Sequence, residues 1–263
     1  MAALEKLLQA QDDKNSILCV GLDPETGKLP EGIEKSPRGI LEFNKRLIEA
    51  TSDVCCAYKL NFAFYERYGV EGFEILKRTF EAIPRRNFSI ADAKRGDIGN
   101  TSRAYAASCF EYFGADSITV HAWMGTDSVS PFLEYKNKLV FALALTSNPG
   151  SADFQRVESR EEPMWKILIH KTKRWAPPSQ LGYVVGATHP EELAQAREIA
   201  PERALLIPGI GAQGGDLAKT LEANAGSPAV INSSRAIIYA SSGSDFAERA
   251  REECEKFNRE ANK

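Results

Sequence analysis

The sequence has 263 residues, a length that suits one large α/β barrel or two small domains. Apolar residues make up 43% of the chain and charged residues 26%, which is an ordinary globular balance. The formal net charge is -3, so there is no strong basic field to attract nucleic acid or an anionic membrane surface.

The cysteines and the N-terminal residues indicate the compartment. The cysteines number five and show no Cys-x-x-Cys spacing, which predicts buried free thiols in a reducing cytosol rather than disulfides. The first residues lack a signal-peptide core, and no apolar run approaches membrane-spanning length. We therefore expect a cytoplasmic protein with neither a membrane nor a nucleic acid as partner.

Apolar runs that predict strands alternate along the chain with patterns that predict helices. Strands are expected at residues 16–23, 54–61, 88–94, 116–121, 138–146, 182–187, 204–208 and 229–232. Helices are expected at residues 38–51, 65–83, 97–113, 190–199 and 215–225, within 147–178, and from about residue 245. Nearly all the strand runs are continuously apolar, as in parallel strands that are buried on both faces.

The number and order of these elements favour an α/β fold, a (β/α)8 TIM barrel, with residues 1–263 as a single domain. A doubly wound open sheet is the alternative. In such barrels the active site lies at the C-terminal ends of the strands. The polar residues expected there are Asp23, Lys59, Asn61, Asp92, Lys94, His121, Ser147 and Arg235. His170 and His189 are expected on the surface instead, and no His, Cys and carboxylate cluster has metal-ligand spacing.

One charged stretch follows the third predicted strand and reads Asp-Ala-Lys-Arg-Gly-Asp-Ile-Gly-Asn-Thr at residues 92–101. Strand alternation places Asp92 and Lys94 on the same face, and Gly96 is expected to end the strand before Asp97 begins a helix. Lys59 arrives at a similar place at the end of the second strand. Two lysines among carboxylates are costly to bury unless chemistry uses them, although a structural ion pair is the simpler alternative.

Two loops near the C-terminus have the character of a phosphate site. Residues 208–215 form a glycine-rich loop between the seventh strand and a helix, and backbone amides in such a loop bind anions. Residues 232–235, Asn-Ser-Ser-Arg, follow the eighth strand and add hydroxyls and a guanidinium. The loops after strands seven and eight are the usual phosphate site of this fold.

The stretch at residues 92–101 resembles the signature of the orotidine 5′-phosphate decarboxylase family. The resemblance runs the length of the chain, and its C-terminal half is similar to the subgroup of bacterial and apicomplexan enzymes. The further segments that carry it are Val-Gly-Leu-Asp at 20–23, Lys-Leu-Asn at 59–61, Thr-Ser-Asn-Pro-Gly at 146–150, and the two loops at 208–215 and 232–235.

The resemblance implies that orotidine 5′-monophosphate loses carbon dioxide to give uridine 5′-monophosphate, the last step of de novo synthesis of that nucleotide. It implies neither a metal nor an organic cofactor. The implied catalytic residues form an alternating charge array of Lys59, Asp92, Lys94 and Asp97, in which Lys94 protonates C6 of the pyrimidine, Asp92 crowds the departing carboxylate and Lys59 orients Asp92.

The remaining roles that the resemblance implies concern binding. Asp23 and Asn61 hold the ribose hydroxyls, Ser147 reads the pyrimidine edge, and Gln213, Ser234 and Arg235 hold the phosphate. Ile98 and Pro208 provide an apolar surface beside the leaving carbon dioxide. Asp97 and Thr101 reach into the site of a second subunit, which makes the working unit a homodimer.

Elementary chemistry agrees with the implied reaction. Decarboxylation without an electron sink leaves a carbanion at C6, and a fixed ammonium group supplies both charge stabilisation and a proton there. Flanking carboxylates favour the charged form of such a lysine.

Two rival functions remain at this point. A metal-dependent sugar-phosphate lyase or aldolase, such as a hexulose-phosphate synthase, shares the Asp-x-Lys-x-x-Asp core and would lose activity with a chelator. A non-catalytic nucleotide- or phosphate-binding barrel would bind uridine monophosphate without turnover.

Overall fold

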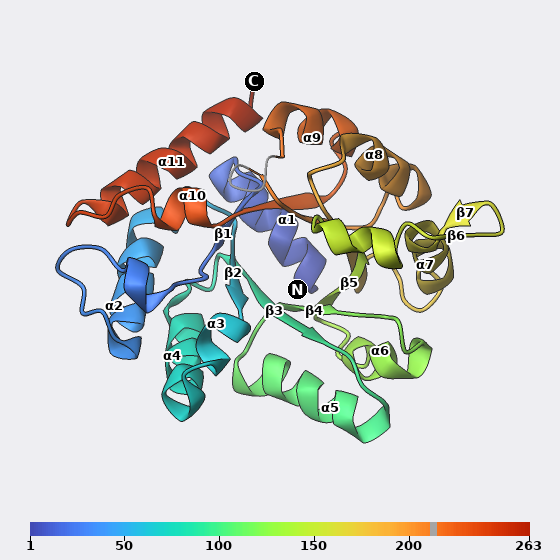
Figure 1. Ribbon diagram of the computed structural model, residues 1–263, viewed down its shortest axis with the longest axis horizontal. Coiled ribbons are helices and arrows are strands. Elements are labelled where there is room, and N and C mark those ends of the chain that lie inside the picture. Colours follow the sequence, from blue (N-terminus) through green and yellow to red (C-terminus); the bar gives the residue numbers. More distant parts are fainter. Residues whose placement is uncertain (211–214) are drawn as a thin grey trace.

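The computed structural model of the protein describes residues 1–210 and 215–263. Within these residues eight parallel strands close into a barrel in the order β1-β10-β9-β8-β5-β4-β3-β2, and the helices surround it (Figure 1). The strands are β1 Leu18–Gly21, β2 Ala57–Asn61, β3 Phe88–Arg95, β4 Ser117–Val120, β5 Leu139–Leu145, β8 Leu181–Val185, β9 Leu205–Pro208 and β10 Ala229–Ser233. Each overlaps one of the eight predicted runs, so the predicted barrel is confirmed and the open sheet is wrong.

Of the longer helices, the first precedes β1, the last follows β10, and the others occupy the connections between strands. They are α1 Ala3–Lys14, α2 Pro37–Thr51, α4 Gly69–Ala82, α5 Gly99–Ala107, α6 Thr126–Leu133, α7 Met164–Thr172, α8 Pro190–Ile199, α9 Leu217–Asn224 and α11 Phe246–Ala261. Two four-residue helices, α3 Ala63–Glu66 and α10 Arg235–Ile238, follow β2 and β10 directly. The helix predicted over 65–83 is divided, because α3 ends at Glu66 and α4 begins at Gly69, whose φ of 59° breaks the helical path.

The helix predicted to begin at Asp97 differs from the structure at both ends. It begins at Gly99, with Ile98 as the N-cap residue, so Asp97 precedes the helix and does not open it. Its last turn, Ser108–Tyr112, widens into a π-helix before Gly114 adopts a φ of 74°. The consequence is that Asp97 lies in the connection between β3 and α5.

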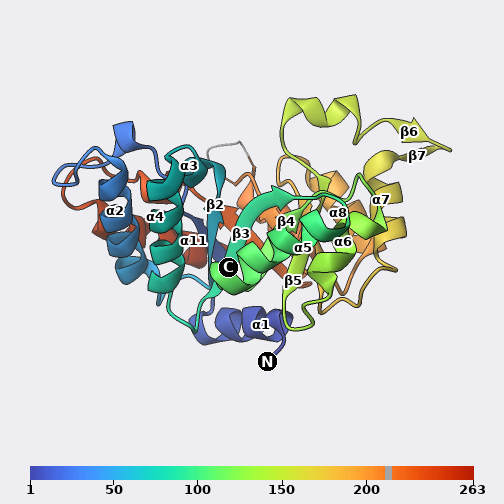
Figure 2. The ribbon, with the colours of Figure 1, turned by 90° about the horizontal axis from the view of Figure 1, so that it is seen from below.

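Opposite ends of the barrel are covered differently. Helix α1, which the sequence analysis did not predict, closes the end where the strands begin (Figure 2). Its buried residues Ala3, Leu7 and Ala10 pack with interior strand residues such as Cys19 and Phe141. At the other end a short antiparallel hairpin of β6 Glu158–Ser159 and β7 Glu162–Pro163 projects outward, also unpredicted. The end where the strands finish is therefore the one left open.

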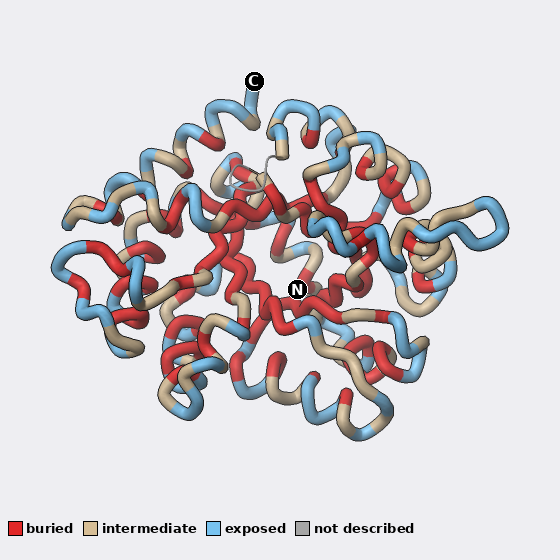
Figure 3. The backbone as a smooth tube through the Cα atoms, viewed as in Figure 1, coloured by how far each residue is buried: buried red, intermediate tan, exposed pale blue. Residues whose placement is uncertain are grey.

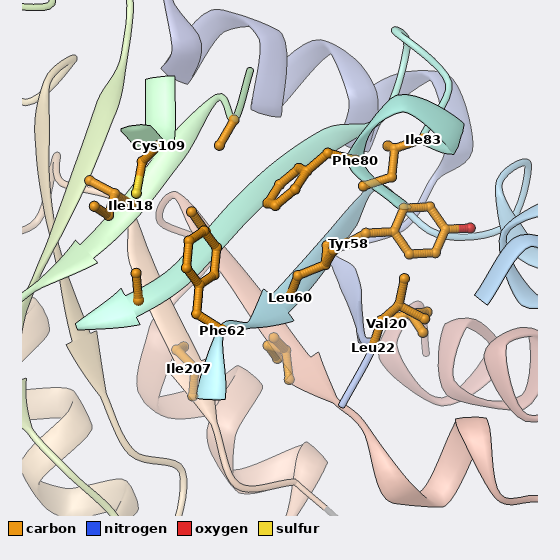
Figure 4. Close-up of a cluster of buried hydrophobic side chains, with 14 of the residues drawn as sticks. Val20, Leu22, Tyr58, Leu60, Phe62, Phe80, Ile83, Cys109, Ile118 and Ile207 are labelled. Carbon is orange, nitrogen blue, oxygen red and sulfur yellow. The ribbon is translucent and has the colours of Figure 1, made fainter. Parts of the chain in front are cut away.

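Strand alternation divides the core into two layers. Side chains such as Val20, Tyr58, Leu60 and Ile118 pack between the strands and the helices (Figure 4). The alternate strand residues face the barrel interior, and Figure 3 shows the buried ring that results. Because side chains alternate along a strand, Lys59 faces inward from between Tyr58 and Leu60.

The cysteines follow the prediction of buried free thiols. All five are buried and unpaired, and burial raises the pKa of the Cys55 thiol to about 12. In the two described segments of the chain, no helix is both long enough and apolar enough to cross a membrane.

Candidate active site

A cavity of about 450 Å³ opens at the C-terminal ends of the strands. Nine of the thirteen predicted site residues line it: Asp23, Lys59, Asn61, Asp92, Lys94, Ser147, Pro208, Ser234 and Arg235. They come from the ends of β1, β2, β3, β5, β9 and β10, which are far apart in the sequence. The closed barrel thus gathers the polar residues that follow its strands.

The floor of the cavity is a chain of opposite charges. Lys59 Nζ lies 3.6 Å from Asp23 Oδ1 and 3.0 Å from Asp92 Oδ2. The other oxygen of Asp92, Oδ1, lies 2.6 Å from Lys94 Nζ. The side chains of Lys59 and Asp92 are 6% and 9% exposed, whereas that of Lys94 is 49% exposed. Lys94 therefore carries the one ammonium of this group that a ligand in the cavity can reach directly.

The two buried members of the array stabilise each other in their ionised forms. Burial alone lowers the pKa of Lys59, but the carboxylates of Asp23 and Asp92 outweigh burial and raise that pKa above its ordinary value. Burial raises the pKa of Asp92, but Lys59 and Lys94 outweigh it and hold that pKa well below its ordinary value. Asp92 is thus a carboxylate that resists protonation inside the barrel.

The end of β3 is held in place by its neighbours. The Arg95 guanidinium donates to the Ala93 carbonyl, pairs with Glu66 and lies over the rings of Phe62 and Tyr105. These contacts fix the backbone just beyond Lys94, which itself has a φ of 47°. A left-handed conformation is uncommon outside glycine and persists only where the surroundings hold it.

A second polar group lies beside Lys59. Ser234 Oγ is 2.9 Å from both Asp23 Oδ2 and the Gly21 carbonyl oxygen, and the backbone N–H of Asn61 donates to Asp23 Oδ1 at 3.3 Å. Gly21 is needed for this approach, because a Cβ there would lie 2.8 Å from the Ser234 Cβ. The Asn232 Oδ1 atom is buried in the same wall and has no hydrogen-bond partner among the described residues.

Three further predicted site residues, Asp97, Ile98 and Thr101, are not among the described residues that line the cavity. Asp97 accepts a hydrogen bond from the Ile98 amide at 2.7 Å, Ile98 is 56% exposed, and Thr101 lies in α5. Gln213 lies outside the described residues. His121 was expected at the site, but that expectation is wrong: its ring packs against Gly96 and faces a neighbouring cavity.

That neighbouring cavity is larger, about 680 Å³, and differs in chemistry. Most of its lining is apolar, including Trp123, Phe154, Trp165 and Trp175. It lacks the paired lysines and carboxylates that make the first cavity a candidate for catalysis. Across the described segments, no three His, Cys or carboxylate residues are grouped so that they could hold a metal ion.

Several polar lining residues had no individual role predicted from the sequence: Glu25, Thr119, Thr146, Asn148 and Asn232. The last three lie in the segments 146–150 and 232–235 that the sequence had indicated, whereas Glu25 and Thr119 were missed. Thr119 had one sequence signal, because it is a polar residue between the apolar residues Ile118 and Val120 of β4. Alternation places its hydroxyl on the opposite face from those two, toward the interior.

Comparison with known proteins agrees with this geometry. Residues 16–250 match the family model described as the orotidine 5′-phosphate decarboxylase / HUMPS family. A protein of Dehalococcoides mccartyi named orotidine 5′-phosphate decarboxylase is 48% identical, with 97% of this chain and 96% of that one covered. One of the same name from Herpetosiphon aurantiacus is 46% identical over the same shares. Among solved structures, the Leishmania donovani OMP decarboxylase superposes with a TM-score of 0.87 at 37% identity, and both chains are fully covered.

Proposed function

The chain belongs to the orotidine 5′-phosphate decarboxylase / HUMPS family, and from this membership we infer its reaction and the roles of its residues. It is a carboxy-lyase that converts orotidine 5′-monophosphate into uridine 5′-monophosphate and carbon dioxide. The structural observation that supports this function best is the chain of charges from Asp23 through Lys59 and Asp92 to Lys94.

The proposed chemistry centres on Lys94 and Asp92. Loss of carbon dioxide leaves an electron pair at C6 of the pyrimidine, and the exposed ammonium of Lys94 stabilises this charge and then donates a proton to C6. Asp92 stays ionised, so a substrate carboxylate placed beside it is repelled, and the repulsion is relieved when carbon dioxide departs. Lys59 holds Asp92 in place at 3.0 Å.

Binding is assigned to the rest of the cavity. We propose that Asp23 and Asn61 hold the ribose and that Ser147 reads the pyrimidine edge. Ser234 and Arg235 hold the phosphate with Gln213, and Pro208 contributes apolar surface near C6. Support comes from the members of this set that the structure describes, which share one cavity where the β9 and β10 ends lie next to β1 in the barrel. A grip on phosphate away from the reacting carbon supplies binding energy that can be used to organise the site.

A homodimer is the proposed working unit. Asp97, Ile98 and Thr101 lie outside the cavity of their own barrel, so their implied roles are best met in the site of a second copy. Ile98 is 56% exposed. Trp123 and Met124, which lie shortly after β4, are 68% and 45% exposed. Large exposed apolar side chains of this kind are typical of an interface. The five unpaired thiols fit our proposal of a reducing, cytoplasmic compartment.

A direct assay tests the proposed reaction. Purified protein is mixed with orotidine 5′-monophosphate and a chelator, and the ultraviolet absorbance of the substrate is followed while the product is identified. We expect uridine 5′-monophosphate to accumulate at a rate that the chelator does not change. Folded protein that is inactive until magnesium and a pentulose or hexulose phosphate are supplied would instead identify the sugar-phosphate lyase. Binding of uridine monophosphate without any turnover would identify a non-catalytic barrel.

A further inference from the structure

The pairing of β3 with β4 is irregular at the charged array. Ala91 lies opposite Ile118, but the next registered pair is Arg95 with Val120. Residues 92–94 therefore lie opposite Thr119 alone. Extra residues in one strand leave backbone groups without ladder partners and change the direction of the side chains they carry. Asp92 and Lys94 both belong to this bulge.

The Thr119 hydroxyl takes the place of the missing ladder contact. Thr119 Oγ1 accepts a hydrogen bond from the Lys94 amide at 3.0 Å and donates one to Asp92 Oδ1 at 2.9 Å. The same Asp92 oxygen accepts a hydrogen bond from Lys94 Nζ at 2.6 Å. One hydroxyl is thus bonded both to the backbone from which the Lys94 side chain starts and to the carboxylate at which it ends.

The surroundings make this hydroxyl hard to replace. Thr119 is 1% exposed, so water cannot readily take over either of its hydrogen bonds. Lys94 has a φ of 47°, a conformation that a non-glycine residue keeps only when its neighbours hold it. Arg95 and its partners hold the backbone after Lys94, and Thr119 holds the amide of Lys94 itself.

We propose that Thr119 is a positioning residue for the decarboxylation, because its hydroxyl sets the place of Lys94 Nζ relative to Asp92. The inference rests on the proposed role of Lys94 as proton donor. Thr119 acts through these two residues. Its contribution is to the chemical step, since its two hydroxyl hydrogen bonds go to Lys94 and Asp92 and to none of the described residues proposed to hold the ribose or the phosphate.

Thr119→Val is the direct test, because it keeps the branched shape and removes both the donor and the acceptor. We expect kcat to fall about 10- to 100-fold, as for a misplaced catalytic group, while KM changes by less than about threefold. Thr119→Ser, which retains the hydroxyl, is expected to recover kcat to within about threefold of the wild type. If Thr119→Val does not fold, Thr119→Ala is compared with Thr119→Ser in the same way.

Thr79→Val is the matched control. Thr79 is also fully buried and also makes two hydrogen bonds, to the Ile75 carbonyl and from Asn44, but it lies in α4 outside the cavity. The Thr79→Val variant is expected to keep the wild-type kcat even if its thermal stability falls. A Thr119→Val enzyme with wild-type kcat, or a Thr119→Ser enzyme as slow as Thr119→Val, would overturn the positioning role. Either of these results would leave the proposed reaction intact as long as the wild type decarboxylates orotidine 5′-monophosphate. An inactive wild type would instead contradict the proposed reaction.

Discussion

Lys94 is the residue on which the proposed chemistry depends most. Its side chain is half exposed and its ammonium contacts Asp92, which keeps Lys59 and Thr119 as partners when Lys94 is removed. Mutation of Lys94 should therefore affect catalysis strongly and stability only weakly.

We expect Lys94→Ala to lower kcat at least about a hundredfold, because the group that stabilises and protonates the carbanion is gone. The free energy of unfolding should change by less than about 1 kcal/mol, because the ion pair is partly solvated. Steady-state kinetics and urea unfolding measure the two effects, and Lys256→Ala, an exposed lysine on α11, is the control for loss of a charge. Substantial turnover by Lys94→Ala would remove Lys94 as the proton donor.

The buried pair also predicts how stability depends on pH. The pKa of Asp92 is held below its ordinary value, so its contribution is fully present above about pH 4 and is lost as pH falls through the folded-state pKa. The pKa of Lys59 is raised, so its contribution is present below about pH 10 and is lost as pH rises through the folded-state value. The contribution of this pair to the free energy of unfolding should therefore not change with pH between these two limits.

Urea unfolding of the wild type and Asp92→Asn at several pH values measures the acid limb. The difference in unfolding free energy should be steady from about pH 5 to pH 8 and should shrink below about pH 4, because only the wild type has this carboxylate to protonate. A difference that stayed constant into acid would contradict the depressed pKa of Asp92.

At the scale of elements, the connection between β3 and α5 depends on one close contact. A Cβ on Gly96 would lie 2.8 Å from His121 Cε1 and 2.9 Å from the His121 carbonyl oxygen. Since the carbonyl belongs to the backbone just beyond β4, it cannot move aside cheaply. The connection carries Asp97 and Ile98, so a shift here displaces the residues proposed to serve the second subunit.

Gly96→Ala should therefore reduce stability by about 1–3 kcal/mol and lower turnover as well. Gly27→Ala is the matched control, because a Cβ there meets nothing within 4 Å in the short 3-10 helix Thr26–Lys28. Thermal unfolding and steady-state kinetics of both variants measure the effect. A Gly96→Ala enzyme indistinguishable from Gly27→Ala would show that the connection adapts without cost.

Helix α1 is a second element with a separable role. Leu7 is fully buried against the barrel interior at the end away from the cavity, whereas its neighbour Leu8 is 36% exposed. We expect Leu7→Ala to cost about 2–5 kcal/mol through the lost burial and the void that remains, with kcat unchanged. Leu8→Ala should change stability much less. A loss of kcat in folded Leu7→Ala would mean that the two ends of the barrel are coupled.

For the whole molecule, the proposed dimer makes a prediction about mixed subunits. Lys94→Ala and Asp97→Ala should each be nearly inactive alone. If Asp97 acts in the partner's site, a mixed dimer has one site with both defects and one intact site. Equal mixing with random exchange then restores about a quarter of the wild-type sites, because half of the dimers are mixed.

Activity after mixing and re-equilibration measures this recovery. As a control, Lys94→Ala is mixed with the double variant Lys94→Ala/Asp97→Ala, which leaves no intact site in any pairing. Absence of recovery in the first mixture, with dimers present by ultracentrifugation, would place Asp97 in its own subunit's site.

The prediction that residues 1–263 form one domain is tested separately, by looking for a single cooperative unfolding transition.

The sequence alone determined the barrel and most of its cavity. Continuous apolar runs specify buried parallel strands, and alternation within them is local, so Lys59 and Asp92 could be placed at strand ends before any contact was known. The family motifs supplied the reaction and nine of the residues that line the cavity.

The tertiary structure decided what depends on contacts between distant residues. The bulge at Lys94 and the hydrogen bond from Thr119 to Asp92 join residues 27 positions apart, and no local pattern specifies their register. The same holds for Asp97 lying outside its own cavity, for His121 facing the apolar cavity and for α1 closing the barrel. Periodicity shows which face a side chain takes, but only the closed barrel shows which other side chains it meets there.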